Sequence, residues 1–199
     1  MVVTDTDINT QVKENVLSNF DSFKDWVNND AYFTTELHGG EGFEIARIPE
    51  SVNKSILKDL EEALGTKVKV NYSFLRLSTK DIDSDMRIHS DTYMDSDYAL
   101  VLYLTDPPEE SFECGTAFWD HQKYGSKFKG TKEEYNKVLN DSSNLDKWSM
   151  KKIVQMKQNR MVVYPTSYFH SRFPFSGWGK DKTDGRVIWV VFFDKVKDG

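Results

Sequence analysis

The chain has almost no cysteine: Cys114 is the only one in 199 residues, which excludes an intrachain disulfide and fits a reducing compartment. It also has no apolar run near the roughly 18 residues that a membrane-spanning helix needs. The N-terminal segment MVVTDTDINTQVKENVL lacks the cationic start and the apolar centre of a signal peptide. We therefore expect a soluble, cytoplasmic protein without a membrane partner.

A long basic tract is missing as well. The chain has 26 Lys and Arg against 32 Asp and Glu, which gives a formal charge of −6. Because nucleic-acid binding depends on clustered positive charge, this composition argues against a nucleic-acid partner. Aromatic residues, in contrast, make up 14% of the chain. We expect them to build the core of a single domain over residues 1–199.

The sequence predicts two well-defined helices and a shorter one. In SVNKSILKDLEEALG, apolar residues recur at helical spacing, with Ser51 placed to cap the helix and Gly65 placed to end it. In TKEEYNKVLND, Thr131 and Glu134 have the spacing of a capping box. A short helix is expected among the first 35 or so residues. Residues 1–66 are therefore interpreted as a helical support for a core over residues 67–199.

Short apolar or alternating segments between turn residues predict strands. The clearest are residues 68–77, 97–105, 115–121 and 186–193, and a further strand is expected over 43–48. The string KKIVQMKQNRMVVYP, at 151–165, is interpreted as a hairpin. Many short strands with few helices indicate a mainly β fold with flanking helices (α+β), arranged as a sandwich or a barrel.

Two short strings carry the residues with the clearest chemistry. His89 and Asp91 stand in RIHSD, two positions apart, so on a strand both side chains leave the same face. His170 stands in YPTSYFHSR, after an apolar strand. Two imidazoles and one carboxylate around a cation would form the facial triad of non-haem Fe(II) oxygenases. The alternative is a surface His-x-Asp and an unrelated histidine.

The other histidines leave little room for a different site. A metalloenzyme of the cupin type often uses three or four histidines, and this chain has four in all. His38 is expected in a loop and His121 in a surface hairpin, so both are poorly placed for such a site.

The order of these residues resembles the 2-oxoglutarate- and Fe(II)-dependent oxygenase superfamily, in its prolyl-hydroxylase-like branch. His-x-Asp, a distant His and a later Arg follow one another, and the strings LVLYLTDPPEESFECGTAF and GRVIWVVFF resemble segments of that group. The chain is also similar to a small, poorly characterised subfamily of bacteria and phages. The resemblance covers about residues 68–193. The sequence departs from the pattern of that family in three places. Cys114-Gly115 replaces a Gly-Gly turn, and a helical insertion occupies about 131–140. His170 and Arg186 are 16 positions apart, which is a longer spacing than is usual in the family.

The resemblance implies a double-stranded β-helix (a jelly-roll, cupin-like barrel) that holds Fe(II) through His89, Asp91 and His170 as the catalytic metal ligands. The cofactors would be Fe(II), 2-oxoglutarate and O2, with ascorbate as an auxiliary reductant. 2-Oxoglutarate would chelate the iron and be converted to succinate and CO2. The expected outcome is hydroxylation of a C–H bond in a protein side chain or a small metabolite, so the partner would be a small-molecule or peptide substrate.

The same resemblance suggests which residues bind 2-oxoglutarate. Arg186 would pair with the far carboxylate through its planar guanidinium, and Arg172, two positions beyond His170, is the rival for this role. Tyr103 would hydrogen-bond the same carboxylate, or else be a core tyrosine. Thr116 is a weaker pocket candidate, or else a structural strand threonine. The alternative to an enzyme is a non-catalytic metal- or ligand-binding β-barrel protein.

Overall fold

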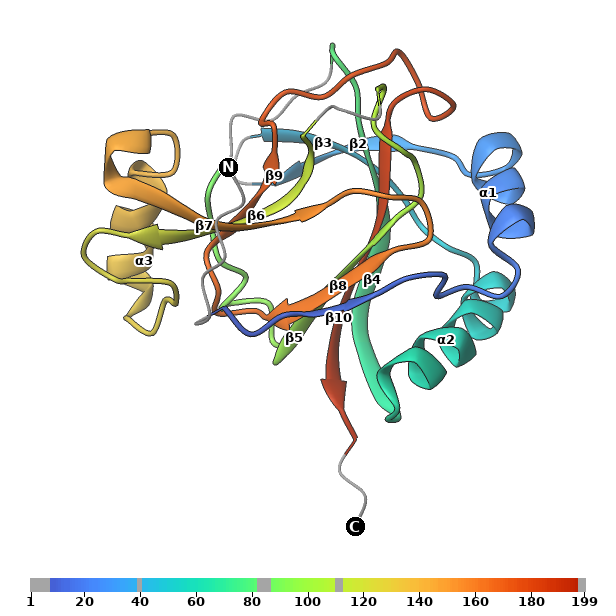
Figure 1. The fold of residues 1–199 in the computed structure, drawn as a ribbon, viewed down its shortest axis with the longest axis horizontal. Coiled ribbons are helices and arrows are strands. Elements are labelled where there is room, and N and C mark those ends of the chain that lie inside the picture. The colour runs from blue at the N-terminus through green and yellow to red at the C-terminus, as the bar shows by residue number, and fades with distance from the viewer. Residues whose placement is uncertain (1–7, 39–40, 82–86, 110–112, 197–199) are drawn as a thin grey trace.

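The computed structural model describes residues 8–38, 41–81, 87–109 and 113–196. Within these ranges the chain is mainly β, with ten strands and three α-helices (Figure 1). The elements in chain order are β1 (Gln11–Lys13), α1 (Phe20–Asn29), β2 (Thr34–His38), β3 (Glu41–Ala46), α2 (Glu50–Leu64), β4 (Val68–Ser78), β5 (Tyr98–Tyr103), β6 (Gly115–His121), α3 (Lys132–Asn140), a 3-10 turn (Leu145–Lys147), β7 (Trp148–Gln155), β8 (Met161–Pro165), β9 (His170–Phe173) and β10 (Arg186–Lys195).

The strands form two antiparallel sheets. The large sheet has the order β1-β8-β5-β10-β4-β3-β2, and the small sheet has the order β7-β6-β9. Strand β10 lies at the middle of the large sheet, where Ile188 is opposite both Arg76 of β4 and Tyr103 of β5. Residues opposite each other in a ladder point to the same face, so this register places the polar side chains of Arg76 and Tyr103 on the same side of the sheet.

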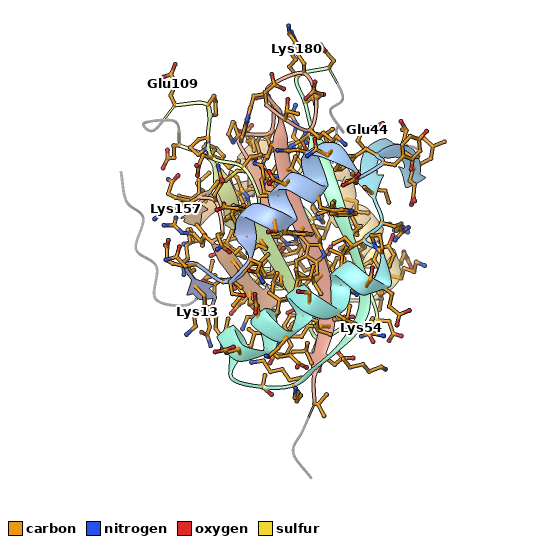
Figure 2. All side chains as sticks on the ribbon, turned by 90° about the vertical axis from the view of Figure 1, so that its right-hand side faces the viewer. Lys13, Glu44, Lys54, Glu109, Lys157 and Lys180 are labelled. Atoms are coloured by element: carbon orange, nitrogen blue, oxygen red, sulfur yellow. The ribbon has the colours of Figure 1, made fainter. Side chains whose placement is uncertain are left out.

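The two faces of the large sheet carry different cores because side chains alternate along each strand. One face is covered by α1 and α2, which lie across the strands in Figure 2. The core there includes Phe23 and Val27 of α1, Ile56 and Leu60 of α2, and Trp189 of β10. The opposite face, called the inner face below, turns toward the small sheet and is lined by a second core. That core includes Val101, Tyr103, Phe118, Tyr164 and Ile188.

The small sheet is covered on its far side by the connection between β6 and β7, which contains α3. A third core fills this layer and includes Ile88, Trp119, Val138, Trp148 and Phe169. The helix starts with the predicted capping box: the Thr131 hydroxyl accepts from the Glu134 N–H, and the Glu134 carboxylate accepts from the Thr131 N–H. The prediction for this helix is therefore confirmed, including its cap.

Other local predictions meet a mixed outcome. Gly65 ends α2 in the left-handed conformation, with φ of 67°, as expected. Ser51 does not cap that helix, because the helix already begins at Glu50 and its N-cap position is Pro49. The predicted hairpin over 151–165 is wrong: β7 pairs with β6 in the small sheet, whereas β8 pairs with β1 and β5 in the large one.

The first 66 residues supply more than helices. Strands β1, β2 and β3 all join the large sheet, β1 at one edge and β2 at the other. Among the described residues, no helix is both long enough and apolar enough to cross a membrane.

Candidate metal centre

The structure brings His89, Asp91 and His170 together where the His-x-Asp segment runs beside β9. His89 and His170 form an isolated antiparallel bridge, in which the His89 N–H donates to the His170 carbonyl (3.0 Å) and the His170 N–H donates to the His89 carbonyl (2.8 Å). The Asp91 N–H donates to the Thr166 carbonyl at 2.8 Å. Backbone pairing thus fixes the two segments in one register, although His89 and His170 are 81 positions apart in sequence (170 − 89 = 81).

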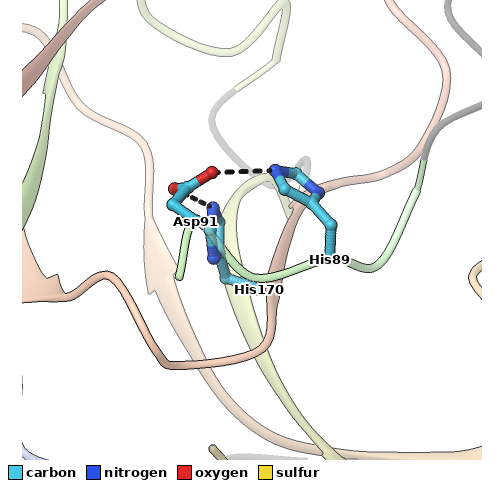
Figure 3. A group of neighbouring side chains, drawn as sticks. All are labelled: His89, Asp91 and His170. Carbon is cyan, nitrogen blue, oxygen red and sulfur yellow. Dashed lines mark ion pairs between the residues drawn. The ribbon is translucent and has the colours of Figure 1, made fainter. Parts of the chain in front are cut away.

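The three side chains point at a common position, as Figure 3 shows. The Asp91 carboxylate faces both imidazoles, with Oδ1 3.7 Å from Nε2 of His89 and Oδ2 3.3 Å from Nε2 of His170. The two imidazole centroids are 4.5 Å apart. One ligand atom from each of the three residues lies within 4.8 Å of the other two. The side chains are largely shielded, with exposed fractions of 19%, 14% and 8% for His89, Asp91 and His170.

The hydrogen bonds at the back of both rings decide which nitrogen faces the centre. Nδ1 of His89 lies 3.0 Å from the Arg87 carbonyl, and Nδ1 of His170 lies 3.0 Å from the Tyr168 carbonyl. A carbonyl only accepts, so Nδ1 carries the proton in each ring. Burial lowers the pKa of His170 to about 4, so this ring is neutral near pH 7 and its Nε2 presents a lone pair.

Arg186 lies on the inner face at the start of β10, as a buried cation. Its side chain is 2% exposed, Nη2 donates only a long hydrogen bond (3.5 Å) to the Gly115 carbonyl, and Nε has no hydrogen-bond partner among the described residues. Burial lowers the pKa of the guanidinium, and the side chains that favour its charged form are Tyr103, Cys114 and Tyr164, none of them a carboxylate. Because Arg stays protonated in proteins, this is a buried charge with no carboxylate partner among the described residues.

Tyr103 and Thr116 lie beside this cation. The Tyr103 hydroxyl is 2.7 Å from Oγ1 of Thr116 and 3.2 Å from the Val154 carbonyl, and both side chains are buried. Burial raises the pKa of Tyr103 to about 12, so the phenol stays a protonated donor. Two hydroxyls and a guanidinium are thus collected between the two sheets.

Comparison with known proteins assigns the chain to a family. A family model described as "Family of unknown function (DUF6445)" matches residues 11–193. The chain belongs to the DUF6445 family. No curated protein matches its sequence.

Solved structures reveal the fold that this DUF6445 chain shares. It is similar to HygX from Streptomyces hygroscopicus with nickel and 2-oxoglutarate bound (TM-score 0.58, 13% identity, 94% of this chain and 82% of that one). It is also similar to SnoK, a non-haem α-ketoglutarate-dependent carbocyclase from nogalamycin biosynthesis (0.59, 11%, 94% and 80%). A Pseudomonas putida prolyl-4-hydroxylase is a third relative in fold (0.51, 12%, 96% and 95%). The DUF6445 chain therefore has the fold of 2-oxoglutarate-dependent oxygenases.

The rival arginine occupies a different place in the DUF6445 chain. Arg172 follows His170 by two positions on β9, so both leave the same face of the strand. Its Nη1 donates to Oγ of Ser78 at 3.1 Å, and its side chain is less buried than that of Arg186. Ser78 is the residue opposite Arg186 in the large sheet. Both guanidinium groups therefore lie on the inner side, and Nε of Arg186 has no hydrogen-bond partner in the described part of the chain.

Sequence reasoning missed Tyr164, on β8. Its ring packs against His170 with centroids 4.7 Å apart. Burial raises the pKa of its hydroxyl, the negative charge of Asp91 raises it further, and the positive charge of Arg186 opposes both effects. Tyr164 thus lies in the electrostatic range of both charged groups. In MVVYP it looks like one more core residue, and the only signal is that it is the hydroxyl-bearing side chain in an otherwise apolar strand.

Proposed function

We propose that this chain is an Fe(II)- and 2-oxoglutarate-dependent dioxygenase that oxidises a C–H bond, most simply by hydroxylation, in a protein side chain or a small metabolite. The observation that carries the proposal is the set of donors at the candidate centre. Two imidazole nitrogens and one carboxylate face a common position, and hydrogen bonds behind the rings turn their lone pairs toward it. Lone pairs that face each other repel, and a cation between them would relieve that repulsion.

The donor types favour iron. Imidazole with carboxylate suits Fe(II), and three protein ligands leave the remaining coordination positions open for a co-substrate and O2. When bound, Fe(II) with 2-oxoglutarate and O2 supplies the oxidising power for C–H cleavage. The contribution of the protein is to hold His89 and His170 in one register and to keep His170 neutral.

The buried cation supports 2-oxoglutarate as co-substrate. Arg186 needs a negative partner, and a carboxylate would meet its fork-shaped guanidinium in a bidentate pair. Tyr103, whose hydroxyl lies 2.7 Å from Oγ1 of Thr116, would donate to the same carboxylate if the Thr116 hydroxyl became the donor to the phenol oxygen. We assign Arg172 a secondary place, because it already bonds Ser78. In this proposal the two sheets are the two halves of a jelly roll, and the co-substrate lies between them.

The first test is metal binding in the apoprotein. Titration with Co(II), followed by calorimetry without O2, should show one tight site, and 2-oxoglutarate should bind only after the metal. Asp91→Asn should abolish the site. Asp141→Asn is the matched control, because Asp141 also faces a histidine, at 3.2 Å from Nε2 of His121, but no second imidazole in the described ranges forms a pair with it.

Turnover is the second test. The Fe(II)-loaded protein should form succinate from 2-oxoglutarate, and Asp91→Asn should not. Binding of metal without 2-oxoglutarate binding or consumption would instead favour the non-catalytic binding protein. A wild-type chain that binds neither would refute the proposal.

A further inference from the structure

The segment that carries His89 and Asp91 has two sides, and only one of them faces the candidate metal centre. His89 and Asp91 turn inward, whereas Ile88 is fully buried in the third core, under α3. The Ile88 N–H donates to the Ser142 carbonyl at 3.2 Å, just beyond the end of α3. The connection between β6 and β7 therefore contacts this segment from outside, while β9 contacts it from inside.

One peptide group between the two ligands is held at both ends. The Ser90 carbonyl accepts a hydrogen bond from the Tyr135 hydroxyl of α3. The Asp91 N–H belongs to the same planar peptide group and donates to the Thr166 carbonyl at 2.8 Å. Fixing both ends of a planar group fixes its rotation, and that rotation sets the direction in which the Asp91 side chain leaves the backbone.

Tyr135 is itself held in place. Its ring centroid lies 5.1 Å from that of Phe128 and 5.1 Å from that of Tyr93. Its helix is anchored by the Thr131–Glu134 capping box and by Val138, which is 1% exposed in the third core. The hydroxyl thus reaches the Ser90 carbonyl from a rigid base rather than from a free side chain.

We propose that α3 is a positioning element for the metal-binding segment, and that Tyr135 acts as its positioning residue by orienting the Ser90–Asp91 peptide group. This inference rests on the proposed function, because it assumes that Asp91 binds the metal. Tyr135 does not contact the metal or the co-substrate. Its effect reaches the centre through the backbone, as outer-shell partners orient the ligands of other metal sites.

The test compares Tyr135→Phe with Tyr93→Phe. Both substitutions keep the ring and remove one hydroxyl that bonds a backbone carbonyl, Ser90 in the first case and Gly130 in the second. Tyr135→Phe should bind Co(II) about tenfold more weakly, the low end of the range for outer-shell partners. Its Co(II) d–d absorption spectrum should also change, because one ligand is reoriented. Tyr93→Phe should keep the wild-type affinity and spectrum.

Each result has one meaning. If both variants lower the melting temperature but bind Co(II) with the wild-type affinity and spectrum, Tyr135 is merely structural and the inference is overturned. If the wild-type chain itself binds no metal, the proposed function fails instead. Should Tyr135→Phe not fold, Val138→Ala replaces it, since it loosens the same helix where it packs near Ile88. Unchanged Co(II) affinity and an unchanged spectrum in that variant would overturn the positioning role of α3.

Discussion

Replacing Arg186 with methionine should have opposite effects on stability and on ligand binding. Methionine keeps much of the volume and removes the charge. Arg186 is 2% exposed, its Nε has no partner among the described residues, and its hydrogen bond to the Gly115 carbonyl is 3.5 Å long. The folded state therefore carries a desolvated cation that the unfolded chain leaves in water. Arg186→Met removes that penalty.

The size of the effect follows from the burial. An uncompensated buried ion costs several kcal/mol, and apolar replacement of buried ionic groups stabilises proteins by about 1–4 kcal/mol. We expect Arg186→Met to raise the free energy of unfolding by about 1–3 kcal/mol, since the Gly115 carbonyl and nearby phenols offset part of the cost. At about 2–4 °C per kcal/mol for a chain of this length, the melting temperature should rise by about 2–12 °C.

Ligand binding should change in the other direction. Removing one partner of a buried, hydrogen-bonded charge pair costs about 2–5 kcal/mol. The affinity for 2-oxoglutarate should therefore fall between about 30-fold and 5,000-fold. The assay is calorimetric titration of the Co(II)-loaded protein with 2-oxoglutarate, together with thermal unfolding of the apoprotein. Arg172→Met is the comparison, and it should weaken 2-oxoglutarate binding much less.

Two results would contradict this reasoning. If Arg186→Met lowers the apoprotein's melting temperature and still binds 2-oxoglutarate as the wild type does, Arg186 is not the unpaired carboxylate receptor described above. If Arg172→Met loses the affinity instead, the assignment of the two arginines is reversed.

Three further outcomes are expected. Saturating Co(II), at about 100 times its dissociation constant, should stabilise the fold by about 2.7 kcal/mol, and an excess of chelator should reverse the shift in melting temperature; no shift would argue against a metal site. Gly115→Ala should destabilise by about 3 kcal/mol, because a Cβ there would lie 1.9 Å from the Val154 carbonyl. A Cβ at Gly65 would meet open space, so Gly65→Ala should lower the free energy of unfolding, measured in urea, by only about 1–2 kcal/mol. Equal losses of stability in the Gly115→Ala and Gly65→Ala variants would contradict the predicted clash with Val154. Thr131→Ala should cost about 1 kcal/mol by removing the cap of α3, whereas unchanged urea unfolding would show that the cap contributes nothing.

Local sequence signals predict elements well where the cause is local. The α3 cap depends on Thr131 and Glu134, three positions apart, and the end of α2 depends on the freedom of Gly65 to adopt a positive φ. Short apolar or alternating segments likewise place β4, β5, β6 and β10 close to their observed bounds. These features could be read from the sequence because neighbouring residues decide them.

The failed hairpin shows where local signals end. Its turn residue Asn159 is bound to distant segments: its N–H donates to the Tyr103 carbonyl (3.0 Å), and its side chain exchanges hydrogen bonds with the Leu17 backbone at 2.8 and 3.0 Å. These bonds hold the turn near the large sheet, where β8 pairs with β1 and β5, whereas β7 pairs with β6 in the small sheet. A turn-like string specifies a change of direction, but not the sheet that each strand joins.

His121 illustrates the same limit. It is 5% exposed, with Nδ1 accepting from the Lys123 N–H and Nε2 3.2 Å from Oδ2 of Asp141, so it is a satisfied core histidine and not the expected surface residue. Its partners come from a turn two residues away and from the end of α3, 20 positions on. Tyr135 and Tyr164 were not predicted for the same reason, since only the packing of α3 and β8 places the Tyr135 hydroxyl at Ser90 and the Tyr164 ring at His170.

The residues that the sequence did single out share a physical property. His89, Asp91 and His170 place lone pairs face to face, and Arg186 keeps a buried charge without a carboxylate among the described residues. Both features oppose folding when no ligand is bound, and natural proteins tolerate such unfavourable arrangements mainly at functional sites. A cation at the three facing side chains would relieve the lone-pair repulsion, and an anion at Arg186 would compensate the buried charge. Stabilisation of the protein by a ligand at either site is therefore better evidence of function than the fold is. The fold alone does not decide the function, because this chain is similar in fold both to a carbocyclase and to a prolyl hydroxylase.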